Sequence, residues 1–282
     1  MLKIALPNKG SLSEDSLKLL REAGYKLRRD NRELSVIDAD NHIDFLFLRP
    51  RDIAVYVADG VLDLGITGRD LLLDSTAPAQ ELMALGFGGS RFCYAAPAAS
   101  QLSSQEFAGL RIATSYPNIV IADQLQRNCQ AEIIKLDGAV EISIELGVAD
   151  LIADVVDSGA TLKQMGLKII GEPILFSEAI LIGNHRTDPE SPAIHRFMRR
   201  IEGIIVARSY VIVEYDVKDQ LLAHCCQITP GIEAPTVSPL NKAGWCAVKA
   251  MVRRSELNTV IDQLEEAGAN GIIVSDIRTC RI

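Results

Sequence analysis

The sequence predicts an α/β protein that ends in a small α+β domain of its own. Three observations lead to this fold class. Short apolar runs alternate with helical patterns up to about residue 208, the pattern changes near residue 209, and 48% of the 282 residues are hydrophobic. The alternation is typical of βαβ units and a largely parallel sheet. A chain of this length and composition more often forms two or three domains than one.

The first part of the chain contains short apolar runs that are expected to be strands. They cover residues 2–7, 43–49, 62–67, 92–97, 111–115, 132–136 and 151–156. Ser11 followed by Glu14 predicts a capping box at the start of a helix, and Gly24 predicts its end. The segment 7–10 therefore joins a strand to a helix N-terminus, where anions are favoured.

The last part of the chain has a different order of elements. We expect a strand at 210–217, a helix at 218–227, strands at 236–240 and 245–252, a helix at 255–267 and a strand at 271–277. This βαββαβ order is that of a ferredoxin-like unit. The sequence therefore predicts a separate C-terminal domain.

Composition excludes several classes of protein. A net charge of -8 and a pI near 5.1 argue against nucleic acid as a partner, because a duplex binder needs a basic face. No apolar run approaches a membrane span and no export signal is visible, so we expect a cytoplasmic protein without a membrane partner. The six cysteines form no CxxC pair and the four histidines are scattered, which favours reduced thiols over zinc or disulfides.

The segment 150–162 carries the most informative chemistry, because an apolar strand with acids is followed by a loop of small residues. Backbone N–H groups of this loop can surround a phosphate monoester; the residues are Ser158, Gly159, Ala160 and Thr161. Asp154 and Asp157 can accept hydrogen bonds from ribose hydroxyls or support Mg²⁺ through water. A strand that ends in a turn and a capped helix would use the same residue types.

Residues after other predicted strands add candidates. Lys9, Arg49 and Arg51 are cations at strand ends, where open α/β sheets bind ligands, although ordinary surface charges would look the same. Asp70 either caps the next helix or faces a cleft. Tyr116 either stacks on a base or forms part of a wall.

Six segments in order resemble the long form of the ATP phosphoribosyltransferase family. They are ALPNKGSLSE, FLRPRDIAVYVADG, LDLGITGRDLL, RIATSYPN, LDGAVEISIELGVADLIADVVDSGATL and TPGIEAPTVSPL. The fifth resembles the family's signature for 5-phosphoribosyl 1-pyrophosphate (PRPP) at Glu141, Gly147, Ala149, Ile152, Asp154, Ser158, Gly159, Thr161 and Leu162. Asp157 occupies a variable position of that signature.

The resemblance implies two periplasmic-binding-protein-like lobes with the active site between them and an ACT-like domain that binds L-histidine as feedback inhibitor. The corresponding boundaries are 1–90 plus 178–208 for the first lobe, 91–177 for the second and 209–282 for the regulatory domain. The implied reaction transfers the phosphoribosyl group of PRPP to N1 of ATP and releases pyrophosphate, the first step of L-histidine biosynthesis. The resemblance also implies dimers that assemble into hexamers, and it leaves AMP open as a further ligand.

The resemblance and the strand ends together assign roles to residues. The expected catalytic residues are Lys9, Arg49 and Asp154. The expected PRPP-binding residues are Glu141, Asp154, Asp157, Ser158, Gly159, Ala160 and Thr161, and those for ATP are Lys9, Arg49, Asp70 and Tyr116. Asp216 and Thr236 are expected to bind histidine. Mg²⁺ is expected to be held mainly by substrate phosphates, with Asp154 as the candidate protein ligand.

Two other functions stay open on the sequence alone. A cytoplasmic two-lobed sensor would have the same fold without chemistry, but it would need no phosphate loop beside ribose-accepting carboxylates. Another phosphoribosyltransferase with a different acceptor base would share the PRPP loop. The segments outside that loop favour ATP and histidine.

Overall fold

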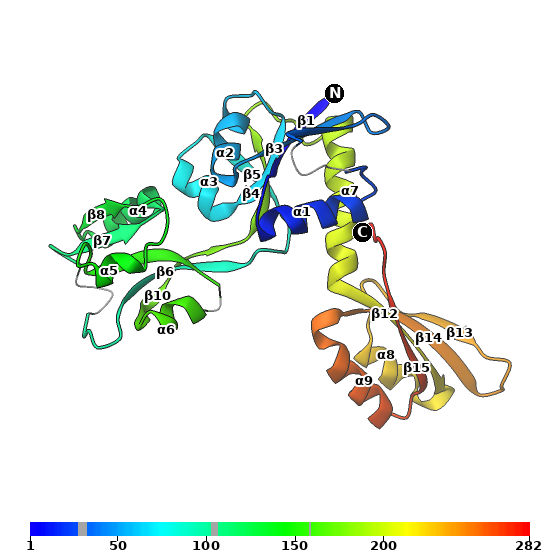
Figure 1. Ribbon diagram of the computed structural model, residues 1–282. Coiled ribbons are helices and arrows are strands. Elements are labelled where there is room, and N and C mark those ends of the chain that lie inside the picture. The colour runs from blue at the N-terminus through cyan, green and yellow to red at the C-terminus, as the bar shows by residue number, and fades with distance from the viewer. Residues whose placement is uncertain (28–32, 103–106, 158) are drawn as a thin grey trace. The chain divides into compact units, whose positions relative to one another are not determined.

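The computed structural model describes residues 1–27, 33–102, 107–157 and 159–282 (Figure 1). Within these ranges the strands form three sheets of six, five and four strands. Contacts divide the chain into two compact units, residues 1–21 with 25–189 and residues 22–24 with 190–282. The first unit contains the two larger sheets, and the second contains the small sheet and a long helix, α7 (Pro192–Ser209).

The six-stranded sheet of the described chain has the order β2-β3-β1-β4-β11-β5. Its strands are β1 (Leu2–Pro7), β2 (Ser35–Asp38), β3 (Ile43–Leu48), β4 (Leu64–Gly68), β5 (Ala79–Ala84) and β11 (Ala179–Asn184). The helices that alternate with them are α1 (Ser11–Glu22), α2 (Pro50–Ala58) and α3 (Arg69–Ser75). Buried Ile53 and Val57 of α2 pack on this sheet so closely that a Cβ on Gly65 would lie 2.5 Å from Ile53.

The five-stranded sheet, as far as the chain is described, has the order β10-β6-β9-β7-β8. Its strands are β6 (Ser90–Pro97), β7 (Arg111–Thr114), β8 (Glu132–Lys135), β9 (Leu151–Val156) and β10 (Leu167–Ser177). The helices that accompany it are α4 (Pro117–Arg127), α5 (Ile142–Glu145) and α6 (Ala160–Gln164). Buried side chains from successive residues of β6 and β9 enter two separate core clusters, which is the arrangement expected when both faces of a sheet are covered.

The chain crosses between the two large sheets twice. It leaves the first sheet after β5 and returns through Glu178, which lies between β10 and β11 (Figure 1). The two crossings are hydrogen-bonded, because Leu85 N donates to Ala179 O and Ala179 N donates to Phe87 O, each at 2.9 Å. We call residues 176–178 the crossing segment.

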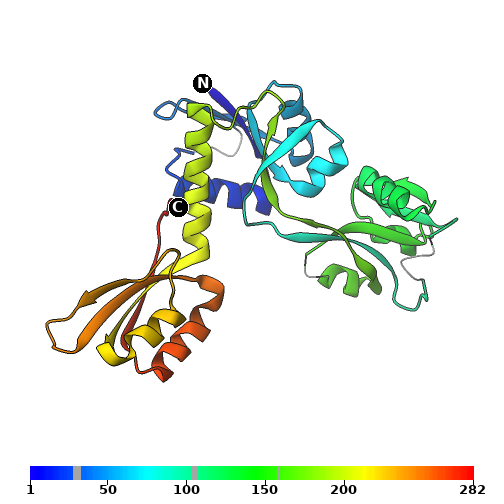
Figure 2. The same cartoon turned by 180° about the vertical axis from the view of Figure 1, so that it is seen from behind.

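The C-terminal domain has the strand order β13-β14-β12-β15 in its described sheet, with neighbouring strands antiparallel. Its elements are β12 (Tyr210–Lys218), η1 (Asp219–Leu221), α8 (Leu222–Ile228), β13 (Thr236–Pro239), β14 (Trp245–Arg253), η2 (Arg254–Glu256), α9 (Leu257–Glu266) and β15 (Asn270–Asp276). Helices α8 and α9 lie side by side on one face of this sheet (Figures 1 and 2). The βαββαβ order predicts this ferredoxin-like domain correctly.

The predicted fold class is confirmed, but the expectation of a largely parallel sheet is wrong. Both large sheets are mixed, because β2, β5, β6, β10 and β11 run antiparallel to neighbours. Four of these strands, β2, β5, β10 and β11, were not predicted. In β10 a register shift between Ile170 and Leu175 and the sequence GEP interrupt the alternation from which strands are predicted.

Two further features concern the class of protein. No helix in the described ranges is long and apolar enough to cross a membrane. All six cysteines lie within the described part of the chain, and none of them is paired with another there.

Candidate active site

The parallel strands of the first sheet end at one edge and place three predicted residues there. Strands β3, β1 and β4 are adjacent and parallel, and Lys9, Arg49 and Asp70 follow them. The loop after β1 is tied to the end of β3, because Asn8 N donates to Leu48 O at 2.8 Å. Lys9 and Arg49 are both exposed. The structure therefore brings two cations to neighbouring strand ends and leaves their side chains accessible.

The parallel strands of the second sheet place the remaining predicted residues. Tyr116 follows β7, and the loop from Asp157 follows β9, which is parallel to β7. Gly159 has φ +77°, a left-handed conformation that favours glycine, and Thr161 is exposed in the first turn of α6. Ser158, expected to bind PRPP, lies outside the described residues.

Asp154 lies near the carboxyl end of β9 and is half-buried. Burial, and after it the negative charges of Glu141 and Asp70, raise the pKa of its carboxyl to about 6. A hydrogen bond from Val155 N to Asp154 Oδ1, at 2.8 Å, and the charge of Arg51 act in the opposite direction. Glu141, Asp70 and Arg51 therefore lie close enough to Asp154 for their charges to act on its carboxyl.

The side chain of Tyr116 contacts one residue associated with each of the two large sheets. Its ring packs edge-on against Phe92, with centroids 5.3 Å apart, and the Arg51 guanidinium lies 4.6 Å from the ring centroid. Burial raises the pKa of its hydroxyl, and the carboxylates of Asp70 and Asp154 raise it further. The phenol is therefore neutral, and its hydroxyl faces the Asp70 carboxylate.

Asp74 at the end of α3 connects these groups. It is 7% exposed, pairs with Arg51 at 3.1 Å and accepts a hydrogen bond from Asn118 N at 2.9 Å. Asn118 Nδ2 also donates to Asp74 O at 2.7 Å. Tyr116 is the N-cap of α4 and makes no side-chain capping bond. Asp74, which lies on the helix after β4 of the six-stranded sheet, instead accepts a hydrogen bond from an N–H at the start of α4.

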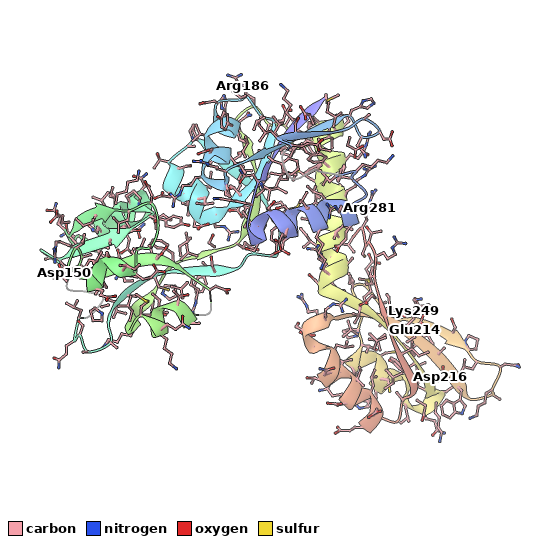
Figure 3. All side chains as sticks on the ribbon, in the orientation of Figure 1. Asp150, Arg186, Glu214, Asp216, Lys249 and Arg281 are labelled. Atoms are coloured by element: carbon pink, nitrogen blue, oxygen red, sulfur yellow. The ribbon has the colours of Figure 1, made fainter. Side chains whose placement is uncertain are left out.

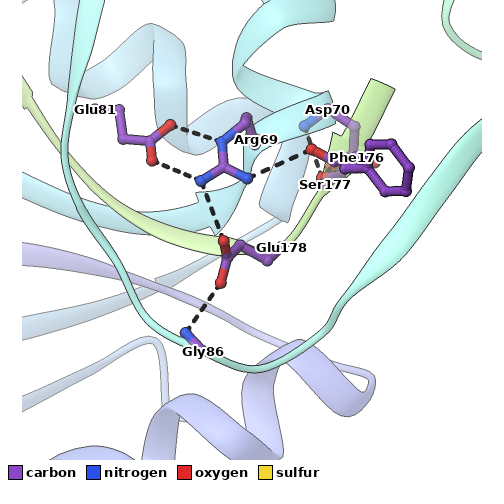
Figure 4. Close-up of polar contacts among 7 residues, drawn as sticks. All are labelled: Arg69, Asp70, Glu81, Gly86, Phe176, Ser177 and Glu178. Atoms are coloured by element: carbon purple, nitrogen blue, oxygen red, sulfur yellow. Dashed lines mark hydrogen bonds and ion pairs between the residues drawn. The ribbon is translucent and has the colours of Figure 1, made fainter. Parts of the chain in front are cut away.

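A network of charges holds the crossing segment at the start of α3 (Figure 4). Arg69 makes two hydrogen bonds to Glu81, at 2.7 and 2.8 Å, and one to Glu178 at 3.3 Å. Glu178 also accepts from Gly86 N at 3.1 Å. Hydrogen bonds to Glu81 raise the pKa of Arg69, and hydrogen bonds from Arg69 lower that of Glu81. Asp70 does not cap α3, because Gly68 is the N-cap and has no side chain.

A cavity of about 530 Å³ adjoins this network and reaches the start of the loop that is predicted to bind PRPP. Its lining includes Arg69, Arg91, Asp157, Ser177 and Glu178. Asp157 is exposed there, at the start of the loop. The predicted loop is thus next to an open volume that contains charged groups from both sheets.

The two residues predicted to bind histidine lie on one face of the C-terminal sheet. Val211, Val213, Tyr215 and Val217 of β12 point into the core beneath α8 and α9, so Asp216 faces the opposite side. Thr236 pairs with Lys249 on β14, and Lys249 forms a 2.7 Å ion pair with Glu214 (Figure 3). Asp216 pairs with Ala247. Asp216 and Thr236 therefore share a face but are offset, with β14 between them.

Comparison with known proteins shows the family. A family model described as ATP phosphoribosyltransferase matches residues 49–203, which is more than half of the chain. The chain belongs to the ATP phosphoribosyltransferase family. A second model, described as the HisG C-terminal domain, matches residues 207–279.

Relatives in the ATP phosphoribosyltransferase family align with the chain from end to end. The chain is 56% identical to the ATP phosphoribosyltransferase of Salinibacter ruber, with all of both chains covered, and 53% identical to that of Nocardia farcinica, with 100% of this chain and 99% of the relative covered. A chain of the ATP phosphoribosyl transferase (HisG:HisZ) complex from Thermotoga maritima is 29% identical and superposes with a TM-score of 0.63 over 73% of this chain and 99% of that one.

These findings decide between the functions that the sequence left open. The predicted family, in its long form, and the predicted enzyme, an ATP phosphoribosyltransferase of the first step of histidine biosynthesis, are confirmed. The roles of individual residues stay predictions. Sequence reasoning missed Asp74, Asn118, Arg69 and Ser177, whose partners lie far away in the chain, and no local motif distinguishes them.

Proposed function

We propose that this chain transfers the phosphoribosyl group of PRPP to N1 of ATP at the edge where β4, β7 and β9 end. The observation that carries this proposal is the convergence of Asp70, Tyr116 and Asp154 from three different strands on one site. The charges of Asp70 and Asp154 raise the pKa of Tyr116, and the charge of Asp70 raises that of Asp154, which supports it. Perturbed carboxyls at strand ends of α/β sheets are frequently functional.

The PRPP side of the site is the loop after β9. Asp154 and Glu141 accept hydrogen bonds from the ribose hydroxyls, and the loop from Asp157 to Thr161 surrounds the 5-phosphate with backbone N–H groups. The left-handed Gly159 supports this role, because it turns the chain sharply at the point where the phosphate would lie. Asp154 must be ionised to act purely as a hydrogen-bond acceptor for the ribose hydroxyls.

The ATP side of the site is formed by Tyr116, Asp70 and the two cations. Arg51 lies over one face of the Tyr116 ring, so adenine stacks there after Arg51 moves toward the phosphates. Arg51 is suited to this movement because its side chain is 45% exposed. Adenine N1 already has a lone pair, so the chain has to position the base rather than deprotonate it.

Negative charge develops on the pyrophosphate as it leaves. Lys9 and Arg49 stabilise it, since both are exposed cations at the ends of adjacent strands. The described residues contain no group of three or more His, Cys, Asp or Glu that could hold a metal by itself. The residues fit a Mg²⁺ that arrives on the substrate, because Glu141 and Asp70 concentrate negative charge around Asp154. Mg²⁺ would neutralise phosphate charge; the substrate phosphates would mainly hold it, with Asp154 as the candidate protein ligand.

The test is direct. Purified protein is mixed with ATP, PRPP and Mg²⁺, and the absorbance of the N1-substituted adenine is followed with pyrophosphatase present. Product formation is expected. PRPP binding without product would indicate another acceptor base, and absence of binding of either substrate would indicate a binding protein.

L-Histidine is proposed to inhibit from the C-terminal domain. Asp216 offers a half-buried carboxylate for the amino or imidazole group, and Gly271 leaves room beside it, since even a Cβ on Gly271 would be 3.9 Å from Asp216 Oδ2. Inhibition then requires a coupling free energy of about 1–3 kcal/mol between two sites. Asp216→Ala should remove inhibition and keep activity, whereas Asp262→Ala on exposed α9 should leave inhibition intact.

The assembly and location are part of the same proposal. We infer a homo-oligomer built from dimers, up to a hexamer, in the cytoplasm, as the family resemblance implies. Sedimentation velocity measures the assembly, and a monomer at micromolar concentration would contradict it.

A further inference from the structure

The first two residues of α3, Arg69 and Asp70, contact each of the three residues of the crossing segment. Arg69 N donates to Glu178 O at 3.0 Å and Arg69 Nη1 to Phe176 O at 3.4 Å, in addition to the Arg69–Glu178 ion pair. Asp70 contacts Ser177, which lies between these two residues (Figure 4). The start of α3 is therefore bonded to all three residues of the crossing segment.

Ser177 and Asp70 are joined by two hydrogen bonds. The Ser177 hydroxyl donates to Asp70 Oδ1 at 2.8 Å and accepts from Asp70 N at 3.0 Å. Ser177 is 5% exposed and Asp70 is 8% exposed, so water competes little for these bonds. A serine that both accepts from the backbone and donates to the side chain of the same residue leaves that side chain few rotamers.

Gly68 provides the space for this arrangement. A Cβ on Gly68 would lie 2.3 Å from Asp70 Oδ1, so the carboxylate occupies the volume that any other residue at position 68 would fill. Gly68 has φ -82°, which every residue adopts, and its conformation therefore does not require glycine. The requirement comes from the Asp70 carboxylate.

We propose that Ser177 is a positioning residue for the transfer reaction: its hydroxyl, together with the space at Gly68, fixes the Asp70 carboxylate toward Tyr116 for ATP binding. This inference rests on the proposed role of Asp70 in the ATP site. The Tyr116 hydroxyl faces the carboxylate that Ser177 holds, so a rotated Asp70 would leave both Tyr116 and the ligand without that acceptor. Ser177 itself does not touch the reacting atoms.

Ser177→Ala tests the proposal with a matched control, Ser75→Ala. The Ser75 hydroxyl also donates to one acceptor, Leu72 O at 2.6 Å, and accepts from one backbone N–H, Ala77 N at 3.1 Å, at the other end of α3. Ser177→Ala should raise KM for ATP about tenfold, as expected for loss of one hydrogen bond to a charged group. KM for PRPP should stay the same. Ser75→Ala should leave both KM values unchanged, although it should lower the melting temperature about as much as Ser177→Ala does.

Two further variants separate this inference from the proposed function. Gly68→Ala should raise KM for ATP in the same way, because the new Cβ displaces Asp70 Oδ1. In an Asp70→Ala background, which has no side-chain acceptor for Ser177, Ser177→Ala should have no further effect, since both changes act through one carboxylate. If Asp70→Asn leaves KM for ATP unchanged, the proposed role of Asp70 is wrong. If Asp70→Asn raises it and Ser177→Ala does not, or if Ser177→Ala weakens ATP and PRPP equally, the positioning role is overturned.

Discussion

The carboxylates and the cations of the proposed transfer site are held in different ways. Asp70 and Asp154 are buried or half-buried and each accepts a hydrogen bond, from Ser177 and Val155 respectively. Lys9 and Arg49 are exposed at the ends of β1 and β3. The acids are thus fixed before the substrates bind, whereas the cations are free to follow a polyphosphate. The difference implies that changes to the acids affect geometry and pH dependence, and changes to the cations affect charge alone.

The largest effect is expected for Asp154→Asn. Loss of the charged acceptor for the ribose hydroxyls should lower kcat/KM for PRPP about 100-fold, which corresponds to two hydrogen bonds to a charged group. Asp150→Asn changes the same charge at the other end of β9, where Asp150 pairs with Arg111 at 2.9 Å. This control should lower the melting temperature and keep KM for PRPP. If Asp154→Asn and Asp150→Asn changed the kinetics equally, Asp154 would have no specific role in PRPP binding.

The pH dependence should follow Asp154. Its pKa is raised to about 6, first by burial and then by Glu141 and Asp70, so the acceptor form is lost as pH falls below about 6. Initial rates at low PRPP concentration should therefore decline on the acid side of the profile. Glu141→Gln removes a charge that raises this pKa and should move the decline to lower pH. Asp154→Asn reports the titration of the PRPP phosphates alone, and a decline of the same shape in that variant would exclude Asp154 as its cause.

A smaller effect is expected for the cations. Lys9→Ala and Arg49→Ala should each lower kcat/KM for ATP about tenfold, because an exposed charge next to a polyphosphate contributes roughly 1–2 kcal/mol. The loss should shrink as salt is added, since exposed charges are screened. Thermal unfolding should be unchanged, because both side chains are exposed. Lys18→Ala, an exposed lysine on α1, is the control. A large fall in melting temperature for Lys9→Ala would mean that this lysine is also held in place.

The smallest effect is expected at the ion pair between Asp74 and Arg51. Asp74→Asn keeps an acceptor for Asn118 N but loses the ion pair with Arg51, so KM for ATP should rise about fivefold, equivalent to about 1 kcal/mol. Glu202→Gln breaks a surface pair with Arg199 and serves as the comparison. Helix content by circular dichroism should be unchanged in both. An unchanged KM for ATP in Asp74→Asn would show that Arg51 needs no positioning.

The sequence alone predicted the C-terminal domain and most of the strand ends at which the site lies. The order of elements is enough to predict the C-terminal domain, because a βαββαβ chain can fold into few compact topologies. The strand ends follow from turn chemistry, such as the left-handed Gly159 and the loop after Pro7. These properties depend on neighbouring residues, which a sequence displays directly.

Only the tertiary structure decided how the site is held together. Ser177 and Asp70 are 107 residues apart, and Asp74 and Asn118 are 44 apart. Whether they meet depends on the register of β10, which contains a bulge between Ile170 and Leu175 that no local pattern indicates. It depends also on the register of β11 and on the hydrogen bonds between the two crossings. A serine hydroxyl acquires a role in positioning a carboxylate only when burial removes competing water, and burial is a property of the folded chain.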